Sequence, residues 1–308
     1  MKQVIPIVFC FDNNLAMPAC VCITSLLANA NEDTFYDIFI LHSEKENLYK
    51  ADLDKLTQYF KNCNIQYRTV DGTFDRAFEI RGITTPAYYR LLIPELIPEY
   101  DKVIYSDVDV IFREDLSPFY HMVLGDNYLG AVDVGVAFRP KIYKYVQDVL
   151  KLNPSKGYFY SGNLIFNSVL MRKDGLVPRF KELAKNSYTY QDMDVLNIAC
   201  NGRIKSLSPA FCLSNYLLEC IYNCRASVLE HYTPECIQHT IKSGIVHYNG
   251  TKPWNGWCYN QDIWWYYYRK SIVYDDSFVF EYYQKHVNAI ENWGLLKRIK
   301  HLLRYFRK

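Results

Sequence analysis

The chain has 308 residues, half of them apolar and 22% charged, with only 13 Gly and 12 Pro. This composition excludes a disordered, collagen-like or low-complexity protein, and the length is enough to bury a full core without disulfide or zinc staples. The 35 basic and 33 acidic residues give a net charge of +2, which excludes a globally basic nucleic-acid binder. We therefore expect no nucleic-acid partner.

Apolar runs of strand length alternate with helical stripes over the first 135 residues. The pattern predicts strands at residues 4–11, 36–42, 65–70 and 102–105, and helices at 18–29, 47–60 and 87–93. Such alternation predicts an α/β fold with a parallel sheet and helices on its faces. Ligands of these sheets bind at the carboxyl ends of the strands, so motifs that directly follow a strand are the first candidates for a site.

The second half is less regular than the first. We predict strands at residues 158–166 and 245–248 and a helix at 192–200. The other segments, rich in Tyr, Trp and Asn, are interpreted as loops and short helices around a site.

The ten cysteines are scattered, with no CxxC pair and no zinc-finger spacing, and we interpret them as reduced, buried thiols. The N-terminal residues lack the pattern of a signal peptide. No apolar run approaches the about 18 residues that a membrane span needs. These features favour a cytoplasmic protein.

Two carboxylates one residue apart, Asp107 and Asp109, interrupt an apolar stretch. Residues 103–105 before them and 110–112 after them are apolar or aromatic, so solvation alone is a poor account of the pair, because charges placed there need a partner. Mg²⁺ and Mn²⁺ prefer oxygen ligands and share them with substrate phosphates. The same D-x-D spacing recurs twice elsewhere in the chain, so the bare motif is weak evidence.

A second motif overlaps the end of the predicted strand at residues 245–248 and reads H-x-x-G-x-K-P-W over residues 247–254. His247 offers a nitrogen ligand suited to Mn²⁺, Gly250 lets a phosphate approach the backbone, and Lys252 can neutralise a diphosphate. Taken alone, each residue also has an ordinary interpretation, as a structural His, a turn Gly and a surface Lys.

Together these motifs resemble glycosyltransferase family 8, which holds bacterial lipooligosaccharide α-galactosyl- and α-glucosyltransferases and glycogenin. The resemblance extends from residue 4 to about residue 265 and rests on six segments in the family's order. These are residues 8–14, 84–91, 102–109, 158–163, 190–197 and 247–254. It implies a GT-A fold, with a mixed, mainly parallel sheet flanked by helices, and a retaining transfer of a hexose. The donor would be UDP-glucose or UDP-galactose, and the acceptor a cell-surface glycan such as a lipopolysaccharide core.

The family's roles carry over by position. The implied ligands of Mn²⁺, with Mg²⁺ as an alternative, are Asp107, Asp109 and His247. The implied nucleotide-binding residues are Cys10, Asp12, Asn14, Leu15, Asp107, Val108, Asn249, Gly250 and Lys252. The implied sugar-binding residues are Tyr160, Ser161, Gly162 and Asp192. The implied catalytic residues, which would orient the donor sugar or the acceptor, are Arg90, Asp133 and Asp192.

Three residues depart from the family pattern. Leu15 stands where a close bacterial type has a Tyr, so stacking on uracil is lost. Tyr160 stands where Asn or Asp is usual, which changes the contacts with sugar hydroxyls. Met193 stands where some members have a Gln that was proposed as nucleophile, and a thioether cannot take that role. We therefore favour attack on the face from which the diphosphate leaves, while a double displacement through Asp192 stays open.

The C-terminal residues 294–308 carry six basic and no acidic side chains. In a helix, their apolar residues fall within an arc of about 120°. This pattern predicts an amphipathic helix, residues 293–308, on an anionic membrane surface, with packing against the body as the alternative. We expect a catalytic domain at residues 1–270 and a helical, membrane-proximal tail at 271–308. The protein would then associate peripherally with the inner face of the cell membrane, near a glycan or lipid-linked glycan acceptor.

Two other functions remain open. The first is a metal-dependent sugar-nucleotide hydrolase or nucleotidyltransferase, against which the segment at residues 247–254 argues. The second is a catalytically silent glycan-binding relative, against which the intact Asp107, Asp109 and His247 argue. A transferase needs an acceptor for fast turnover, a hydrolase does not, and a binding protein releases no UDP.

Overall fold

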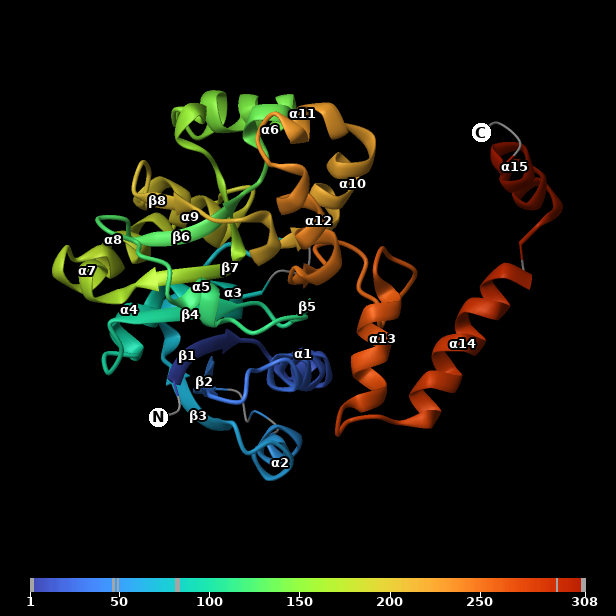
Figure 1. Ribbon diagram of the computed structural model, residues 1–308, viewed down its shortest axis with the longest axis horizontal. Coiled ribbons are helices and arrows are strands. Elements are labelled where there is room, and N and C mark those ends of the chain that lie inside the picture. The colour runs from blue at the N-terminus through green and yellow to red at the C-terminus, as the bar shows by residue number, and fades with distance from the viewer. Residues whose placement is uncertain (1–2, 46–47, 49, 81–83, 292, 306–308) are drawn as a thin grey trace.

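The computed structural model describes residues 3–45, 48, 50–80, 84–291 and 293–305. Its main sheet has seven strands in the order β3-β2-β1-β4-β7-β6-β8 (Figure 1). Their bounds are β1 Gln3–Cys10, β2 Thr34–Ser43, β3 Cys63–Val70, β4 Lys102–Ser106, β6 Leu129–Asp133, β7 Phe159–Asn167 and β8 Ile204–Ser206. Only β7 runs antiparallel to its two neighbours, so the sheet is mixed and mainly parallel.

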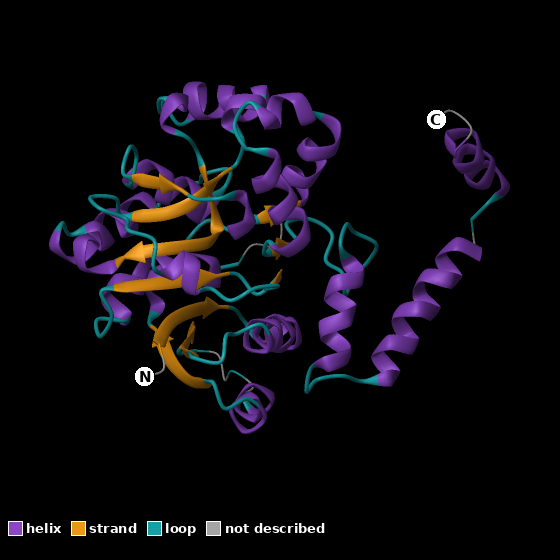
Figure 2. Ribbon diagram, viewed as in Figure 1, coloured by secondary structure: helices purple, strands orange, loops and turns teal. Residues whose placement is uncertain are grey.

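Helices cover both faces of this sheet (Figure 2). On β1, Ile5, Ile7 and Phe9 pack on the side of α1, whereas Val8 and Cys10 belong to the cluster that contains α3, α4, α8 and α9. This alternation follows from the two-residue repeat of a strand buried on both faces. The helices of these two layers are α1 Ala16–Ala28, α2 Ala51–Tyr59, α3 Pro86–Tyr89, α4 Ile93–Leu96, α5 Ser117–Tyr120, α7 Ser168–Lys173, α8 Leu176–Leu183 and α9 Gln191–Ala199.

A small second sheet, in the order β5-β10-β9, lies beside the ends of β4 and β7. Its strands have two residues each: β5 Val110–Ile111, β9 Leu213–Ser214 and β10 Val246–His247. Antiparallel pairing sets His247 opposite Val110 and thereby brings the segment after β4 next to the C-terminal motif. The helices around this sheet are α10 Asn215–Asn223, α11 Arg225–Leu229, α12 Pro234–Ser243 and α13 Gln261–Lys270, and α6 Pro140–Lys144 follows β6.

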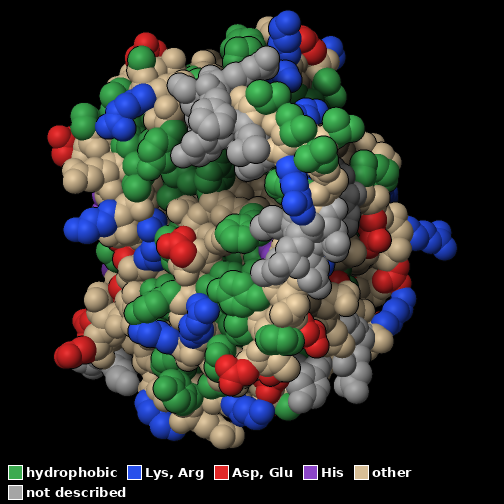
Figure 3. Space-filling model, turned by 90° about the vertical axis from the view of Figure 1, so that its right-hand side faces the viewer, with side chains coloured by type: hydrophobic (Ala, Val, Ile, Leu, Met, Phe, Trp, Pro, Cys, Tyr) green, Lys and Arg blue, Asp and Glu red, His purple; other side chains and the backbone are tan. Residues whose placement is uncertain are grey.

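Two more helices follow α13 on the side of the molecule away from the main sheet (Figure 1): α14 Asp276–Glu291 and α15 Leu295–Tyr305. Trp265 of α13 contacts the rings of Phe278 and Tyr282 on α14. The apolar residues Leu295 and Leu296 at the start of α15 are 73% and 84% exposed. On this side of the molecule, apolar side chains lie among Lys and Arg (Figure 3). Within the described residues, the protein has no helix that is both long and apolar enough to cross a membrane.

Most of the elements expected from the sequence are present, including the predicted α/β fold class. The helix predicted at 47–60 starts at Ala51, and residues 46, 47 and 49 lie outside the described part. The strand predicted at 245–248 is two residues long, and the region predicted as helix 87–93 divides into α3, a 3₁₀ turn at Arg90–Leu92 and α4. Strand β6 was not predicted, because its short run with Gly130 shows no alternation.

Candidate active site

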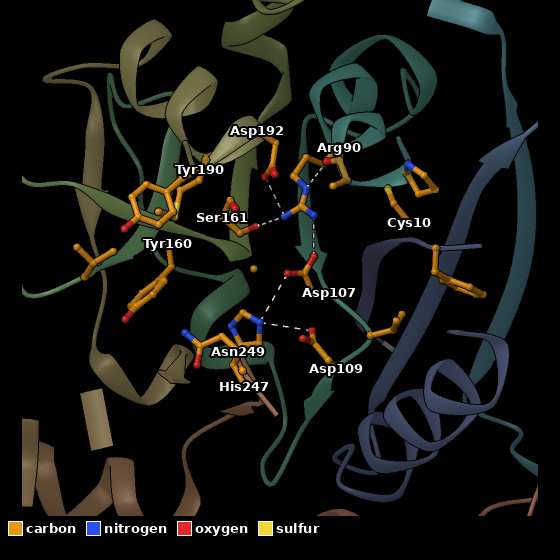
Figure 4. Close-up of a pocket in the computed structure, with 18 of the residues that line it drawn as sticks. Cys10, Arg90, Asp107, Asp109, Tyr160, Ser161, Tyr190, Asp192, His247 and Asn249 are labelled. Atoms are coloured by element: carbon orange, nitrogen blue, oxygen red, sulfur yellow. Dashed lines mark hydrogen bonds and ion pairs between the residues drawn. The ribbon is translucent and has the colours of Figure 1, made fainter. Parts of the chain in front are cut away.

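A pocket of about 600 Å³ lies at the carboxyl ends of β1 and β4. Its wall includes β7, the start of α9, β10 and the loop after it (Figure 4). The lining contains all the residues that the resemblance implicates except Asn14 and Asp133. In Figure 4, Cys10 and Arg90 lie on one side of this pocket, and Tyr160 and Tyr190 on the other. We call the first side, with the metal-ligand candidates, the donor half, and the second the acceptor half, after the ligands that the resemblance implies.

Three side chains could hold a divalent cation together. Asp107 and Asp109 follow β4, and His247 ends β10, with one ligand atom of each lying within 4.8 Å of the others. His247 Nε2 is 3.4 Å from Asp109 Oδ1 and 3.7 Å from Asp107 Oδ2. Two carboxylates and one imidazole are a donor set that suits Mn²⁺, and the remaining positions would be left to water or phosphate. The residues present therefore fit such a metal.

The groups behind this trio fix its geometry. His247 Nδ1 lies 3.5 Å from the Cys212 thiol, on the side of the ring away from the carboxylates, so Nε2 faces Asp109. The Asp107 amide donates to the Gly162 carbonyl at 2.8 Å. A methyl group at Gly162 would stand 2.3 Å from His247 Cε1 and 2.9 Å from Asp107 Oδ2. Gly162 thus provides space for the trio.

Lys252 is part of the same cluster. Its ammonium pairs with Asp109 and donates to the Tyr248 carbonyl at 2.7 Å. Burial alone would raise the pKa of Asp109, but Lys252 and His247 overcome it and lower that pKa below its usual range. Burial would also lower the pKa of His247, yet the Asp109 carboxylate raises it well above its usual value. Asp109 is therefore an ionised group shared by two cations.

Arg90 joins the trio to Asp192. The guanidinium is 5% exposed, and it pairs with Asp107 at 2.8 Å and with Asp192 at 3.3 Å. It also donates to the Ser161 carbonyl at 2.7 Å and lies over the Tyr105 ring. These contacts fix Arg90 from several sides, so it can position carboxylates on two different elements.

Asp192 sits in the first turn of α9. Burial raises the pKa of Asp192 to about 6; Arg90 opposes this shift and Asp107 adds to it. Its Oδ2 is buried, and its partner is the Arg90 guanidinium at 3.3 Å. The preceding residue, Gln191, has a positive φ of 46°, a left-handed conformation rarely adopted outside glycine. This turn starts α9 so that Asp192 lines the pocket.

The nucleotide-binding candidates occupy the turn after β1 and the loop after β10. Cys10, Asp12 and Leu15 line the pocket, and the Asp12 carboxylate accepts from the Asn14 amide at 3.0 Å. Asn14 is exposed and outside the lining. The other lining candidates are Val108, Asn249, Gly250 and Lys252. The Asn249 side chain accepts from the Asn215 amide at 2.9 Å, which ties this loop to α10.

The remaining candidates differ in their surroundings. Tyr160, Ser161 and Gly162 line the pocket, and the Tyr160 hydroxyl accepts from Ser214 Oγ at 2.8 Å. The Asp133 carboxylate instead accepts from the backbone amides of Gly135 at 2.6 Å, Val136 at 2.9 Å and Tyr158 at 3.0 Å. Asp133 thus holds the loop after β6 against the start of β7.

Asp194, the second carboxylate of the D-x-D on α9, was not singled out from the sequence. It is fully buried, and it accepts from the hydroxyls of Tyr145, at 2.6 Å, and Tyr158. It also accepts from the Tyr190 amide at 2.8 Å. Asp194 therefore anchors aromatic residues of the acceptor half, and the spacing from Asp192 could have indicated only that it lies on the same helix.

The acceptor half contains further residues that no motif predicted. They come from the loop after β6, from α6 and from α10: Val134, Arg139, Ile142 and Tyr216. Their sequence positions share no spacing, so pattern analysis could not bring them together.

A mixed, mainly parallel sheet with a D-x-D metal-ligand candidate at its strand ends defines a glycosyltransferase of the GT-A type. The sequence profile of the family described as "Glycosyl transferase family 8" matches residues 6–258. The chain therefore belongs to glycosyl transferase family 8, as the sequence motifs predicted.

Two curated proteins illustrate this relationship. The chain is 25% identical over 270 residues to General stress protein A of Bacillus subtilis, covering 82% of this chain and 88% of that protein. It is also 25% identical over 186 residues to Lipopolysaccharide 1,2-glucosyltransferase of Escherichia coli, covering 55% of this chain and 49% of that protein. This chain thus matches about half the length of the second relative.

Solved structures agree with this assignment. Galactosyltransferase LgtC, in complex with donor and acceptor sugar analogues, superposes with a TM-score of 0.71 at 26% identity, covering 89% of this chain and 98% of that one. The bifunctional glycosyltransferase WbbM gives a TM-score of 0.74 at 22% identity, covering 92% of this chain and 52% of that one. The second likeness concerns the fold alone.

Proposed function

We propose that the protein is a Mn²⁺-dependent, retaining hexosyltransferase that moves glucose or galactose from a UDP-sugar to a hydroxyl of a cell-surface glycan. A lipopolysaccharide core or similar glycan is the acceptor class. The observation that carries this proposal is the convergence of Asp107, Asp109 and His247 with Lys252 in one pocket. A glucosyltransferase and a galactosyltransferase among the similar proteins support the choice of sugars.

The donor half would bind the nucleotide diphosphate. When bound between Asp107, Asp109 and His247, the metal would supply Lewis-acid stabilisation of the leaving diphosphate. Lys252 would add a positive charge at the same place. At Gly250 the nearest protein atom to an added Cβ would be Asn215 Nδ2, 3.6 Å away, so the protein itself leaves room for a phosphate there.

The nucleoside and the transferred sugar would occupy neighbouring parts of the pocket. Around uracil and ribose we place Cys10, Asp12, Asn14, Leu15, Val108 and Asn249. Ser161, Gly162 and Tyr160 would contact the sugar, and the Asp192 carboxylate would accept from a sugar hydroxyl. Arg90 would act by orienting Asp107 and Asp192 at once.

Retention would follow from attack on the face from which the diphosphate leaves. The acceptor hydroxyl must lie about 3–3.5 Å from the anomeric carbon, and its proton would pass to the departing phosphate oxygen. Met193 lines the pocket and offers no carboxylate-type nucleophile. Asp192 is a carboxylate that lines the same pocket and is the alternative nucleophile. If mass spectrometry trapped a glycosyl group on Asp192 as a competent intermediate, this mechanism would be wrong.

The C-terminal helices would bring the catalytic domain to its acceptor. We assign residues 1–270 to the catalytic domain and 271–308 to a membrane-proximal tail, which would place the protein at the inner face of the cell membrane. The exposed apolar residues Leu295, Leu296 and Ile299 on α15, beside basic neighbours, support binding to anionic lipid. Truncation after Asn292 should abolish binding to anionic liposomes and spare donor hydrolysis; unchanged liposome binding would contradict this role.

UDP release from a panel of UDP-sugars, with Mn²⁺ and with EDTA, tests the activity. We expect slow hydrolysis of one hexose donor, loss of this release in EDTA, and faster release with a glycan acceptor. Fast release that no acceptor accelerates would identify a hydrolase instead. No release from any donor, with or without acceptor glycans, would identify a silent binding protein.

A further inference from the structure

Besides His247, three basic side chains line the pocket, and two of them are neutralised by carboxylates. Arg90 pairs with Asp107 and Asp192, and Lys252 pairs with Asp109. The third, Arg139, has no carboxylate within 4.0 Å among the residues that the structure describes. The pocket wall thus carries one positive charge that the protein itself leaves uncompensated.

Arg139 is held in place by neutral groups. It follows the 3₁₀ turn Val136–Phe138, and its Nη1 donates to the Val134 carbonyl at 3.0 Å. Its guanidinium lies over the ring of Tyr216, 4.8 Å from the centroid, and that Tyr is 51% exposed. Within the described part of the chain, Nε and Nη2 donate to no protein atom, so these donors remain for a ligand.

The charge of Arg139 acts on the interior of the pocket. Burial raises the pKa of Tyr160, and both the hydrogen bond from Ser214 and the positive charge of Arg139 oppose this rise. Tyr160 belongs to the segment that would contact the transferred sugar. Arg139 and Tyr160 line the same pocket.

The surroundings of Arg139 suit a sugar ring as well as an anion. Tyr190, Met193, Ile142 and Tyr216 provide aromatic and apolar surface on the same side of the pocket. Aromatic faces stack on the apolar faces of sugar rings. A guanidinium binds a carboxylate or a phosphate through two parallel hydrogen bonds, and more strongly than it binds a neutral hydroxyl.

We propose that the acceptor glycan carries an anionic group, a carboxylate or a phosphate, which Arg139 binds next to the ring of Tyr216. This inference rests on the proposed transferase function and adds the chemical class of the acceptor. The anion would supply the negative charge that the protein leaves out at this position, and Tyr190 would support the adjoining sugar ring.

Three matched sugars test the proposal by direct binding. Methyl β-glucoside, methyl β-glucuronide and the 6-phosphate of methyl β-glucoside are titrated into the full-length protein loaded with UDP and Mn²⁺, with binding measured by NMR. We expect at least one anionic sugar to bind about 10-fold more tightly than the neutral glucoside. The better of the two identifies carboxylate or phosphate as the recognised group.

Substitutions separate Arg139 from a general charge effect. Arg139→Gln should remove the preference and change the affinity of the neutral glucoside by less than about twofold, and Arg139→Lys should keep part of it. Arg179→Gln, an exposed position on α8, removes the same charge from the protein and should keep the whole preference.

Two results would overturn the anionic acceptor. One is equal binding, or no binding, of all three sugars up to millimolar concentration, and the other is a preference that survives Arg139→Gln. Donor hydrolysis without acceptor is measured on the same samples. Absence of donor hydrolysis would contradict the proposed transferase function. The binding comparison of the three sugars would still test the anion preference of Arg139 independently.

Discussion

The donor half and the acceptor half of the pocket are built differently. In the donor half, Asp107, Asp109, Arg90 and Lys252 are all ion-paired with one another or with His247 or Asp192. The acceptor half is aromatic and apolar, and its cation Arg139 has no carboxylate partner among the described residues. On the proposed function, the difference would follow from the ligands. A diphosphate and its metal would bind to charged side chains at fixed positions, whereas a sugar acceptor would pack against an aromatic and apolar surface.

The two halves also differ in how they are supported. The metal-ligand candidates lie at the ends of β4 and β10, and the pairing of β5 with β10 sets their distance. The acceptor half depends on loops and short helices, which the buried Asp194 ties together through Tyr145, Tyr158 and the Tyr190 amide. The positions of the metal-ligand candidates therefore depend on strand pairing, whereas the positions of the aromatic residues in the acceptor half depend on hydrogen bonds to Asp194.

The largest effect should come from Asp109→Asn, which removes a metal-ligand candidate and leaves Lys252 and His247 without their common carboxylate partner. We expect Mn²⁺-dependent UDP release to fall by about 10³-fold, because a Lewis acid contributes several kcal/mol. Asp52→Asn, in the D-x-D of α2 on the surface, is the matched control and should leave the rate unchanged. If Asp109→Asn released UDP at more than a tenth of the wild-type rate, the claim that the Asp109 charge is needed for Mn²⁺-dependent release would be contradicted.

Gly162→Ala tests whether space behind the trio matters as much as charge. The new methyl group would meet His247 Cε1 at 2.3 Å, so the imidazole must move and Mn²⁺ affinity should fall by about 10- to 100-fold. Gly250→Ala meets only Asn215 Nδ2 at 3.6 Å, so Mn²⁺ affinity should be unchanged there while UDP binds more weakly. Calorimetric titration of both variants checks this, and equal Mn²⁺ affinities would contradict it.

Asp192 lies on the boundary between the halves and should make stability depend on pH. Burial raises the pKa of Asp192 from the usual 3.8 to about 6, so between these pH values the folded protein binds more protons at this residue than the unfolded chain does. The stabilisation that protonated Asp192 gives to the folded state is fully present below pH 3.8 and is lost as the pH rises through about 6. Relative to Asp192→Asn, metal-free wild type should gain about 2 kcal/mol of unfolding free energy between pH 7.5 and 4.5. Urea unfolding curves that shift in parallel for both proteins would show that Asp192 is not protonated in the fold.

Tyr145→Phe should have the smallest effect and confine it to the acceptor half. It removes one hydrogen bond to the buried Asp194, at 2.6 Å, which should cost about 1 kcal/mol of unfolding free energy. We expect a higher KM for the acceptor with unchanged donor hydrolysis. Tyr143→Phe, at an exposed position two residues earlier, serves as control. A change in donor hydrolysis in Tyr145→Phe alone would show that the two halves are coupled.

The same contrast explains how much could be predicted from the sequence. Strand β1, helix α1 and strand β4 were predicted to within two residues, because their apolar runs are long and bounded by polar residues. The two-residue strands β5 and β9 were not predicted, because they form only through pairing between segments that are distant in the sequence. The donor-half candidates were found because they occur in motifs. Arg139 and Tyr216 were missed, because only the tertiary fold brings them into one wall.

UDP binding measured by calorimetry in Mn²⁺ and in EDTA tests the central claim, that Asp107, Asp109 and His247 hold a metal for a nucleotide diphosphate. We predict one UDP site per chain in Mn²⁺, at least about 10-fold weaker in EDTA, and equally weak in His247→Gln under both conditions. Equal UDP affinity with Mn²⁺ and EDTA in the wild type, or full Mn²⁺ dependence in His247→Gln, would contradict the account.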